Sequence, residues 1–376
     1  MKFIHIADLH LGKIIYQQNL LSLQEELLGQ VIDYMNEENI PVLVIAGDIY
    51  DRSVPSSEAI TVLNSFLYRL IVKYHKKVIM ISGNHDSSER LQFASDLLKD
   101  QGLYIVTYPE KELKPIIIED VNFYLVPFFK PSYIRYLYND DTIHTYQEAF
   151  ATYLKYQQID TTKNNVLVTH QFVAGNKEPI TSESEVILSV GGTEIIDVNL
   201  FNDFDYVALG HLHASQKMGR ETVRYSGSLM KYSFDEVQQE KGMVEVEIHN
   251  KEVHYKIIPL HPSKDLKKYQ GTYASFLEEG KIENKDDYIS FSLEDTMIVP
   301  NAIDQLRQLY PNVLQITYPK LLQQNEIANT KASDTFENLD MHTLYQEFYQ
   351  NMTGEELSDD LLEILDETLG DDEHVA

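Results

Sequence analysis

Seven residues of metal-binding type occur along this chain, each next to the end of a short apolar segment. Two are aspartates, one is an asparagine and four are histidines: Asp8, His10, Asp48, Asn84, His170, His211 and His213. Mixtures of carboxylate and imidazole ligands suit Mn²⁺, Fe²⁺ or Zn²⁺, and Mg²⁺ where oxygen ligands dominate. Seven such groups exceed the needs of one ion. They predict two adjacent divalent ions, an arrangement suited to hydrolysis of phosphate esters.

The spacing inside each motif supports a shared site. Asp8 and His10 are two residues apart, as are His211 and His213, so each pair lies on one side of an extended chain. Asp48 has two carboxylate oxygens and could bridge both ions. A glycine precedes three of the motifs and lets the backbone bend there; these are Gly47, Gly83 and Gly210.

His85 is the predicted catalytic residue, because it adjoins Asn84 without being needed as a ligand. It could stabilise charge that develops on the phosphate or protonate the leaving oxygen. Asp51 or Asp86 could orient one of the histidines from behind. Two ions about 3.5–4 Å apart would bring the pKa of a shared water near neutrality and hold the phosphate oxygens.

Each motif taken alone is also typical of an ordinary turn or a solvated loop. The combination, in this order and at the ends of apolar segments, is what indicates a metal centre. His5, inside the first apolar segment, is expected to be an ordinary histidine with satisfied hydrogen bonds.

The elements that position these residues are predicted to be buried strands, because continuous apolar segments are typical of parallel sheets. Ligands of open α/β sheets gather at the carboxyl ends of such strands. The segments are residues 3–7, 42–46, 78–82, 166–169 and 206–209. Helical spacing of apolar residues predicts helices over 20–35, 56–74 and 87–101, and hairpins are expected at 116–126 and 243–258. The fold class is therefore α/β, a two-sheet β-sandwich flanked by helices.

The length of 376 residues indicates two or three folded units. We expect a domain over 1–260, a small α+β cap over 265–322 and C-terminal helices in an acidic tail over 334–370. Within the cap, strands are expected at 288–293 and 313–317, with a helix from about 302 to 309 between them. The chain has no cysteine, which excludes disulfides and thiolate metal sites. No signal peptide, membrane-spanning segment or Gly-rich ATP-binding motif is recognised, so a cytoplasmic protein that does not itself bind ATP is expected.

The net charge of −28 is unusual for a protein that handles nucleic acid. Residues 334–376 contain 14 acidic residues and no Lys or Arg, so the other 333 residues carry −28 + 14 = −14. This chain alone should bind a phosphate backbone weakly. A role on DNA would need the metal ions, a local groove or a more basic partner.

The motifs in this order resemble the calcineurin-like metallophosphoesterase superfamily. Within it, the chain is similar to the bacterial SbcD nuclease family through MKFIHIADLHLGK, VIAGDIYDRSVPS, ISGNHDSSERL, VTHQFVAG, GHLHASQ and YSGSLMKYSFDE. The similarity continues through the cap to LYQEFYQNMTGEELSDDLLEIL in the tail. The metal motifs specify only the superfamily, whereas segment 225–236, the cap and the tail specify the SbcD family.

This resemblance implies a role for each motif. Asp8, His10, Asp48 and His213 would hold one metal, and Asp48, Asn84, His170 and His211 the other, with His85 assisting at the transition state. Archaeal and eukaryotic relatives have a histidine where this chain has Asp51, so no role is carried over to that position.

The resemblance also implies an activity and partners. The family acts with an SMC-like ATPase, SbcC, and favours Mn²⁺. It is an ATP-dependent 3′→5′ double-strand exonuclease and a single-strand endonuclease that opens DNA hairpins, in replication, recombination and repair. The cap would face DNA, the tail would dock on the partner's coiled coil, and a dimer of heterodimers is expected.

Three alternatives stay open at this point. The superfamily also includes phosphatases and cyclic-nucleotide phosphodiesterases, and residues 47–53 approach a protein-phosphatase motif. A scaffold that has lost turnover is disfavoured, because no ligand position is degenerate. The tail could also pack its apolar face on its own domain instead of a partner.

Overall fold

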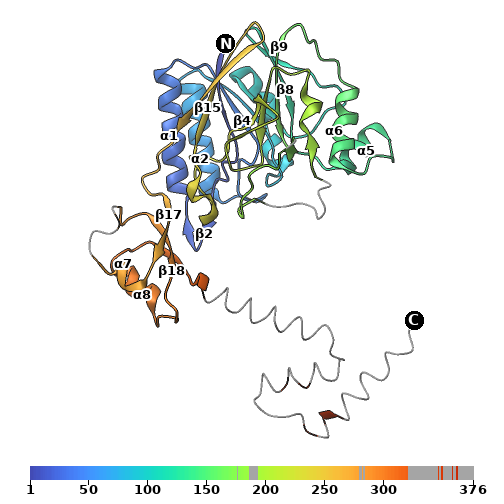
Figure 1. The fold of residues 1–376 in the computed structure, drawn as a ribbon. Coiled ribbons are helices and arrows are strands. Elements are labelled where there is room, and N and C mark those ends of the chain that lie inside the picture. Colours follow the sequence, from blue (N-terminus) through green and yellow to red (C-terminus); the bar gives the residue numbers. More distant parts are fainter. Residues whose placement is uncertain are drawn as a thin grey trace. The chain divides into compact units, whose positions relative to one another are not determined.

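The computed structural model in Figure 1 describes residues 1–175, 177–185, 194–278, 282 and 284–320, with five isolated positions further on: 346, 349, 358, 361 and 362. These residues divide into two compact units. The first contains residues 1–268 and 284–290, and the second contains residues 269–283 and the described residues from 291 onward. The predicted domain limits at 260, 265 and 322 stay predictions, and the predicted tail lies outside the described residues except for the isolated positions.

The first unit is built on two six-stranded mixed sheets, as the sequence predicts. One has the order β16-β15-β1-β4-β5-β6, in which β1, β4, β5 and β6 are parallel. Its strands are β1 (Lys2–Ile6), β4 (Val42–Ala46), β5 (Lys77–Ile81), β6 (Leu103–Val106), β15 (Gly242–His249) and β16 (Glu252–Pro259). The antiparallel pair β15 and β16 is the hairpin predicted at 243–258.

The second sheet has the order β13-β14-β12-β9-β8-β7, and its four central strands are parallel. Its strands are β7 (Ile116–Ile118), β8 (Val121–Val126), β9 (Asn164–His170), β12 (Tyr206–Gly210), β13 (Gln216–Met218) and β14 (Arg220–Tyr225). Strands β7 and β8 form the hairpin predicted at 116–126. Two short pairs, β2 (Ile14–Ile15) with β3 (Gln18–Asn19) and β10 (Val173–Ala174) with β11 (Ile196–Asp197), lie in loops.

A buried apolar cluster joins the inner faces of the two sheets. The ring of Phe3 on β1 lies edge-on to Phe123 on β8 and Tyr206 on β12, with centroids 5.4 and 5.7 Å apart. Edge-to-face rings add to the free energy gained by burying their apolar area. The two sheets therefore form one sandwich with a common core, which confirms the predicted fold class.

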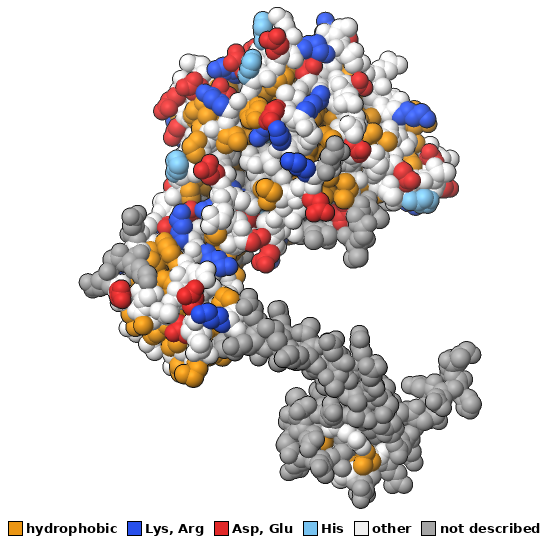
Figure 2. Space-filling model, in the orientation of Figure 1, with side chains coloured by type: hydrophobic (Ala, Val, Ile, Leu, Met, Phe, Trp, Pro, Cys, Tyr) orange, Lys and Arg blue, Asp and Glu red, His pale blue; other side chains and the backbone are white. Residues whose placement is uncertain are grey.

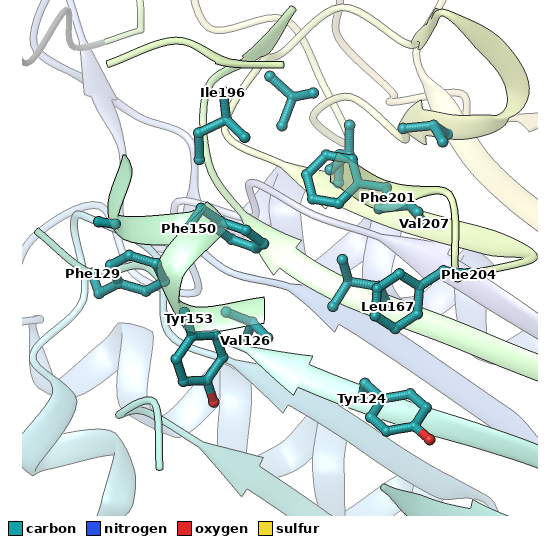
Figure 3. Packing of buried hydrophobic residues seen from close by; sticks show 14 of the residues in the cluster. Tyr124, Val126, Phe129, Phe150, Tyr153, Leu167, Ile196, Phe201, Phe204 and Val207 are labelled. Atoms are coloured by element: carbon teal, nitrogen blue, oxygen red, sulfur yellow. The ribbon is translucent and has the colours of Figure 1, made fainter. Parts of the chain in front are cut away.

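Helices cover the outer faces of the sandwich (Figure 1). Helices α1 (Leu21–Glu37) and α2 (Ser57–Tyr68) lie on the side of the first sheet, and α2 continues as a π-helical turn over Arg69–Lys73. Ser56 caps α2 by accepting a hydrogen bond from the Ala59 amide. On the other side, α5 (Pro131–Tyr138) and α6 (Tyr146–Lys155) cover the second sheet, and Figure 3 shows Phe150 and Tyr153 packed with residues of β8, β9 and β12.

The helix predicted over 87–101 is interrupted. Ser87 caps α3 (Ser88–Gln92), but Phe93 has a non-helical ψ of 125° and Ala94 has a φ of 61°, a left-handed conformation that a continuous helix does not contain. The chain resumes as α4 (Ser95–Leu98) and a 3₁₀ turn over Lys99–Gln101, and ends at Gly102 as predicted.

A three-stranded sheet of order β17-β18-β19 follows the sandwich in the chain. Strands β18 (Tyr288–Leu293) and β19 (Val313–Thr317) and helix α8 (Ala302–Arg307) confirm the predicted elements. Strand β17 (Leu266–Gly271) and helix α7 (Tyr273–Phe276) are additional, because their polar or short sequences give no clear periodicity. Among the described residues, no helix is both long and apolar enough to cross a membrane.

Candidate metal centre

The two sheets bring all seven predicted ligand residues to the carboxyl ends of their strands. Asp8 and His10 follow β1, Asp48 follows β4 and Asn84 follows β5, all from the first sheet. His170 ends β9, and His211 and His213 follow β12, from the second sheet. Every one of them is buried except Asn84, which is partly exposed.

One group of contacts surrounds His170. Its Nδ1 lies 2.8 Å from the Ala46 carbonyl oxygen, which can only accept, so Nδ1 carries the proton. In the neutral ring, Nε2 then presents a lone pair, yet it lies 3.0 Å from Asn84 Oδ1 and 3.3 Å from Asp48 Oδ2. The same Asn84 oxygen is 3.0 Å from His211 Nδ1. Oxygen and nitrogen atoms that converge in this way can share a cation, either a proton on an imidazole or a metal ion.

A second group lies on the other side of Asp48. The Nε2 atoms of His10 and His213 are 3.1 Å apart, and His10 Nε2 is 3.6 Å from Asp48 Oδ2. Ligand atoms of Asp8, His10 and His213 all lie within 4.8 Å of one another. Two ligands on one ion at bonds of about 2.1 Å are separated by roughly 3 Å. The distances therefore fit metal coordination.

The electrostatics of the site show a shortage of positive charge. Burial raises the pKa of Asp8 to about 7. Burial would also raise the pKa of Asp48, but His170 and His10 hold it well below its usual range. Burial opposes protonation of His170, yet the Asp48 and Asp8 carboxylates outweigh it and raise its pKa to about 9. By contrast, burial lowers the pKa of His211 to about 3, which leaves a neutral imidazole suited to a metal.

Backbone geometry at the ligands is unusual. Asp8, His10 and Asp48 have φ values of 53°, 43° and 48°, and His211 has 111°. Such positive φ values cost free energy for residues other than glycine, and they cluster at functional sites. The Asp8 carboxylate accepts two hydrogen bonds from the His211 amide, at 3.0 and 3.2 Å, and so ties one sheet to the other.

The three glycines before the motifs are required chiefly by close approach. A Cβ on Gly210 would lie 1.9 Å from the Ala46 carbonyl oxygen, and a Cβ on Gly83 would lie 2.2 Å from Asp48 Oδ1. Only Gly47 has the positive φ expected of a sharp bend, at 91°, and a Cβ there would also meet the His170 ring. The two sheets approach so closely here because Gly47 and Gly210 have no side chain, and Gly83 leaves room for the Asp48 carboxylate within the first sheet.

His85 lies at the edge of the cluster and is partly exposed. Its amide donates to Asp48 Oδ1 at 2.9 Å, and its Nδ1 donates to the Asp51 carbonyl oxygen at 3.0 Å. Asp51 thus orients this histidine through its backbone, while its carboxylate pairs with Lys13 at 2.9 Å. The Asp86 carboxylate accepts from the amides of Ile49, Tyr50 and Gly83, so in the described part of the chain it supports this loop rather than a histidine.

Three residues behind His213 are absent from the sequence prediction. His213 Nδ1 is 2.6 Å from Ser184 Oγ and 3.2 Å from Glu236 Oε1, and Lys241 Nζ is 2.6 Å from Glu236 Oε2. None of the three has the spacing of a metal motif. The one signal in the sequence is that Glu236 ends the segment 225–236, which specifies the SbcD resemblance. His5 is satisfied as predicted, by the Tyr206 hydroxyl and the Leu209 carbonyl.

The sandwich and its strand-end cluster are those of a calcineurin-like phosphoesterase. The family model with that description matches residues 1–215, and a model described as the type 5 capsule protein repressor C-terminal domain matches residues 262–353. The chain is therefore an enzyme of the metal-dependent phosphodiesterase class.

Curated relatives define the family more narrowly. The SbcD component of the SbcCD nuclease from Staphylococcus saprophyticus is 38% identical over 366 residues, covering 95% of each chain. The protein of the same name from Staphylococcus epidermidis is 36% identical over 362 residues, again covering 95% of each. The chain belongs to the SbcD family of nuclease subunits.

Among solved structures, GAP50, the anchor in the inner membrane complex of Plasmodium, is a remote neighbour. The match covers 85% of this chain and 96% of that chain, with a TM-score of 0.38 and 14% sequence identity. This similarity is too low to support an argument about function.

The close approach at Gly210 leads to a prediction. Gly210→Ala should lower the free energy of unfolding by about 1–3 kcal/mol, the usual range for overpacking, and weaken the binding of divalent metal ions, because β12 must move away from β4. Urea denaturation and metal titration measure the two effects. The matched control is Gly29→Ala in α1, where a Cβ meets nothing within 4 Å and should stabilise the helix by about 0.5–1 kcal/mol. Unchanged stability and binding in Gly210→Ala would contradict the packing argument.

Proposed function

We propose that this chain is the nuclease subunit of an SbcCD-type complex and hydrolyses DNA phosphodiester bonds with two divalent metal ions. The observation that carries the proposal is the buried convergence of imidazole nitrogens and carboxylate oxygens on both sides of Asp48. Membership of the SbcD family supplies the class of substrate. Mn²⁺ is the proposed metal, since the ligands combine imidazole and carboxylate groups, and Mg²⁺ is the alternative.

The contacts support a specific assignment of ligands. Asp8, His10, Asp48 and His213 would hold one ion, and Asp48, Asn84, His170 and His211 the other. Asp48 is shared because its Oδ2 lies 3.6 Å from His10 Nε2 and 3.3 Å from His170 Nε2. When bound, the two ions would lower the pKa of a water nucleophile and neutralise charge on the phosphate.

His85 is the proposed catalytic residue of the chain itself. The Asp51 carbonyl accepts its Nδ1–H, so the other ring nitrogen would take up a proton, and in that form it could donate to a phosphate oxygen or protonate the leaving oxygen. The hydrogen bond from its backbone N–H to Asp48 Oδ1 holds this residue beside the shared ligand. The ring therefore has a defined orientation before DNA binds.

The detailed nuclease activities are proposed from the resemblance to the SbcD family. We propose an ATP-dependent 3′→5′ exonuclease on double strands and a single-strand endonuclease that opens hairpins, acting in the cytoplasm with an SbcC-type ATPase that hydrolyses the ATP. Figure 2 shows acidic and basic side chains interspersed on the face in view, which fits weak DNA binding by this chain alone. Residues 265–322 are proposed to face DNA, and residues 334–370 to bind the ATPase.

Loss of His85 or Asn84 tests the proposed function. In the complex with the ATPase partner, Mn²⁺ and hairpin DNA, His85→Ala should slow cleavage by about 10²–10⁴-fold, the usual contribution of an acid or base. Asn84→Ala should also slow it, because one ligand of the His170 ion is lost. Cleavage is followed on denaturing gels.

The matched control is His254→Ala, an exposed histidine on β16, which should cut at the wild-type rate. Wild-type rates in His85→Ala and Asn84→Ala would contradict the site assignment. Rapid turnover of phosphomonoesters without the partner, and none of DNA, would favour the phosphatase alternative.

A dimer of heterodimers is the proposed assembly, and the first unit has a surface that suits it. Apolar side chains around α2, α3 and α4 are exposed: Val54, Ile60, Tyr68, Phe93 and Leu97. Phe93 is 83% exposed and Leu97 79%, and a groove of about 570 Å³ lies beside them. Exposed apolar side chains gathered in this way are typical of protein interfaces, and we propose that a second copy of this chain covers them.

Phe93→Glu combined with Leu97→Glu should convert the dimer of this chain to a monomer, because two charges would have to be buried in the interface. Light scattering after size exclusion measures the mass. Tyr136→Glu on α5, at a residue 86% exposed, is the control and should leave the dimer intact. A monomeric wild-type chain, or a charged variant that stays dimeric, would contradict this surface as the interface.

A further inference from the structure

The segment 225–236, which distinguishes the SbcD resemblance, lies behind the proposed ligands. The Tyr232 ring packs edge-on against both His10 and His213, with centroids 5.5 Å away in each case. The hydroxyl of Tyr232 donates to the Leu9 carbonyl between the two residues of the first motif. Glu236 lies at the end of the segment and reaches the imidazole of His213.

The Glu236 carboxylate is completely buried, and both of its oxygens have polar partners. Its Oε1 lies 3.2 Å from His213 Nδ1 and also accepts from the Ser184 hydroxyl, which itself contacts His213 Nδ1 at 2.6 Å. Its Oε2 lies 2.6 Å from Lys241 Nζ and accepts from the Tyr232 amide at 3.2 Å.

Lys241 fixes the other side of the same arrangement. Its buried ammonium lies 2.8 Å from the His213 carbonyl oxygen, 2.9 Å from Ser228 Oγ and 2.7 Å from Gln239 Oε1, besides its ion pair with Glu236. His213 is thus held at its ring by the carboxylate and at its backbone by the lysine. A second carboxylate, that of Glu185, accepts from the His213 amide at 2.6 Å.

The chemical consequence concerns the tautomer of His213. A carboxylate beside Nδ1, directly or through the Ser184 hydroxyl, requires Nδ1 to carry the proton, so the lone pair is on Nε2. That nitrogen is the one 3.1 Å from His10 Nε2. In His170 the proton is also fixed on Nδ1, but by a neutral group, the backbone carbonyl of Ala46. A carboxylate makes an imidazole a stronger donor to a metal than a carbonyl does.

We propose that Glu236 is a positioning residue, which fixes the tautomer and direction of His213 as a metal ligand, and that Lys241 keeps the carboxylate in place. This inference rests on the proposed metal centre. Glu236 acts through His213 and is not itself expected to touch metal or DNA. The ligands of the two ions are therefore positioned differently. His213 is held by the buried Glu236–Lys241 ion pair, and His170 is held by the backbone carbonyl of Ala46.

The experiment separates metal affinity from stability with three variants of the full chain: Glu236→Gln, Lys241→Met and the two combined. Calorimetric titration with Mn²⁺ gives the number of ions and their affinities, and thermal melting without metal gives stability. Glu236→Gln should weaken the binding of one of the two Mn²⁺ ions by about 10–100-fold, the usual loss of metal affinity when such a partner of a ligand is removed. This variant should also have a lower melting temperature, since Lys241 is left buried without its carboxylate partner.

The combined variant is decisive. Removing both charges should restore much of the melting temperature, because no unpaired charge stays buried, whereas Mn²⁺ affinity should stay low. The matched control is Glu245→Gln, a buried carboxylate paired with Lys2 and Lys256 on the first sheet, which should lower stability without changing Mn²⁺ binding.

Recovery of Mn²⁺ affinity together with stability in the combined variant would show that Glu236 is merely structural and would overturn the inference. Unchanged affinity in Glu236→Gln would overturn it as well, while two ions bound to the wild type would leave the metal centre standing. A wild-type chain that binds no Mn²⁺ would overturn the metal centre and the inference together.

Discussion

The central constraint on the structure is a buried cluster of carboxylates and histidines where the two sheets meet. This cluster has too little positive charge to balance its carboxylates. Asp8, Asp48 and the rings of four histidines are brought into one buried volume, and the Asn84 oxygen is directed into it. Buried anionic groups are costly unless they are paired. In the protein alone, a proton on His170 supplies part of the missing charge, which is why its pKa is raised to about 9. Divalent ions would supply it more completely.

The rest of the fold serves this convergence. The Phe3, Phe123 and Tyr206 rings hold the sheets together along the core, and the Asp8 carboxylate joins them at the site. The strands can approach because glycine precedes three of the motifs. The left-handed φ values of the ligand residues are the local cost of directing their side chains to a common point.

Much of this can be predicted from the sequence, since the signals are local. Buried strands give continuous apolar segments, so the sequence predicts β1, β4, β5, β9 and β12, and each ligand lies at or after the end of one of them. Helix 87–101 is predicted as continuous because propensity does not reveal the left-handed Ala94. Glu236 escapes prediction because its contact with His213 is made only in the folded chain, and the role of Gly210 in close packing likewise depends on a neighbouring strand.

The central claim is that Asp48 lies between two divalent ions. Anomalous diffraction at the manganese edge, from crystals of the full chain grown with Mn²⁺, tests it most directly. The account predicts two peaks about 3.5–4 Å apart, with an Asp48 carboxylate oxygen beside each. A single peak, or two peaks with Asp48 directed away from them, would contradict it.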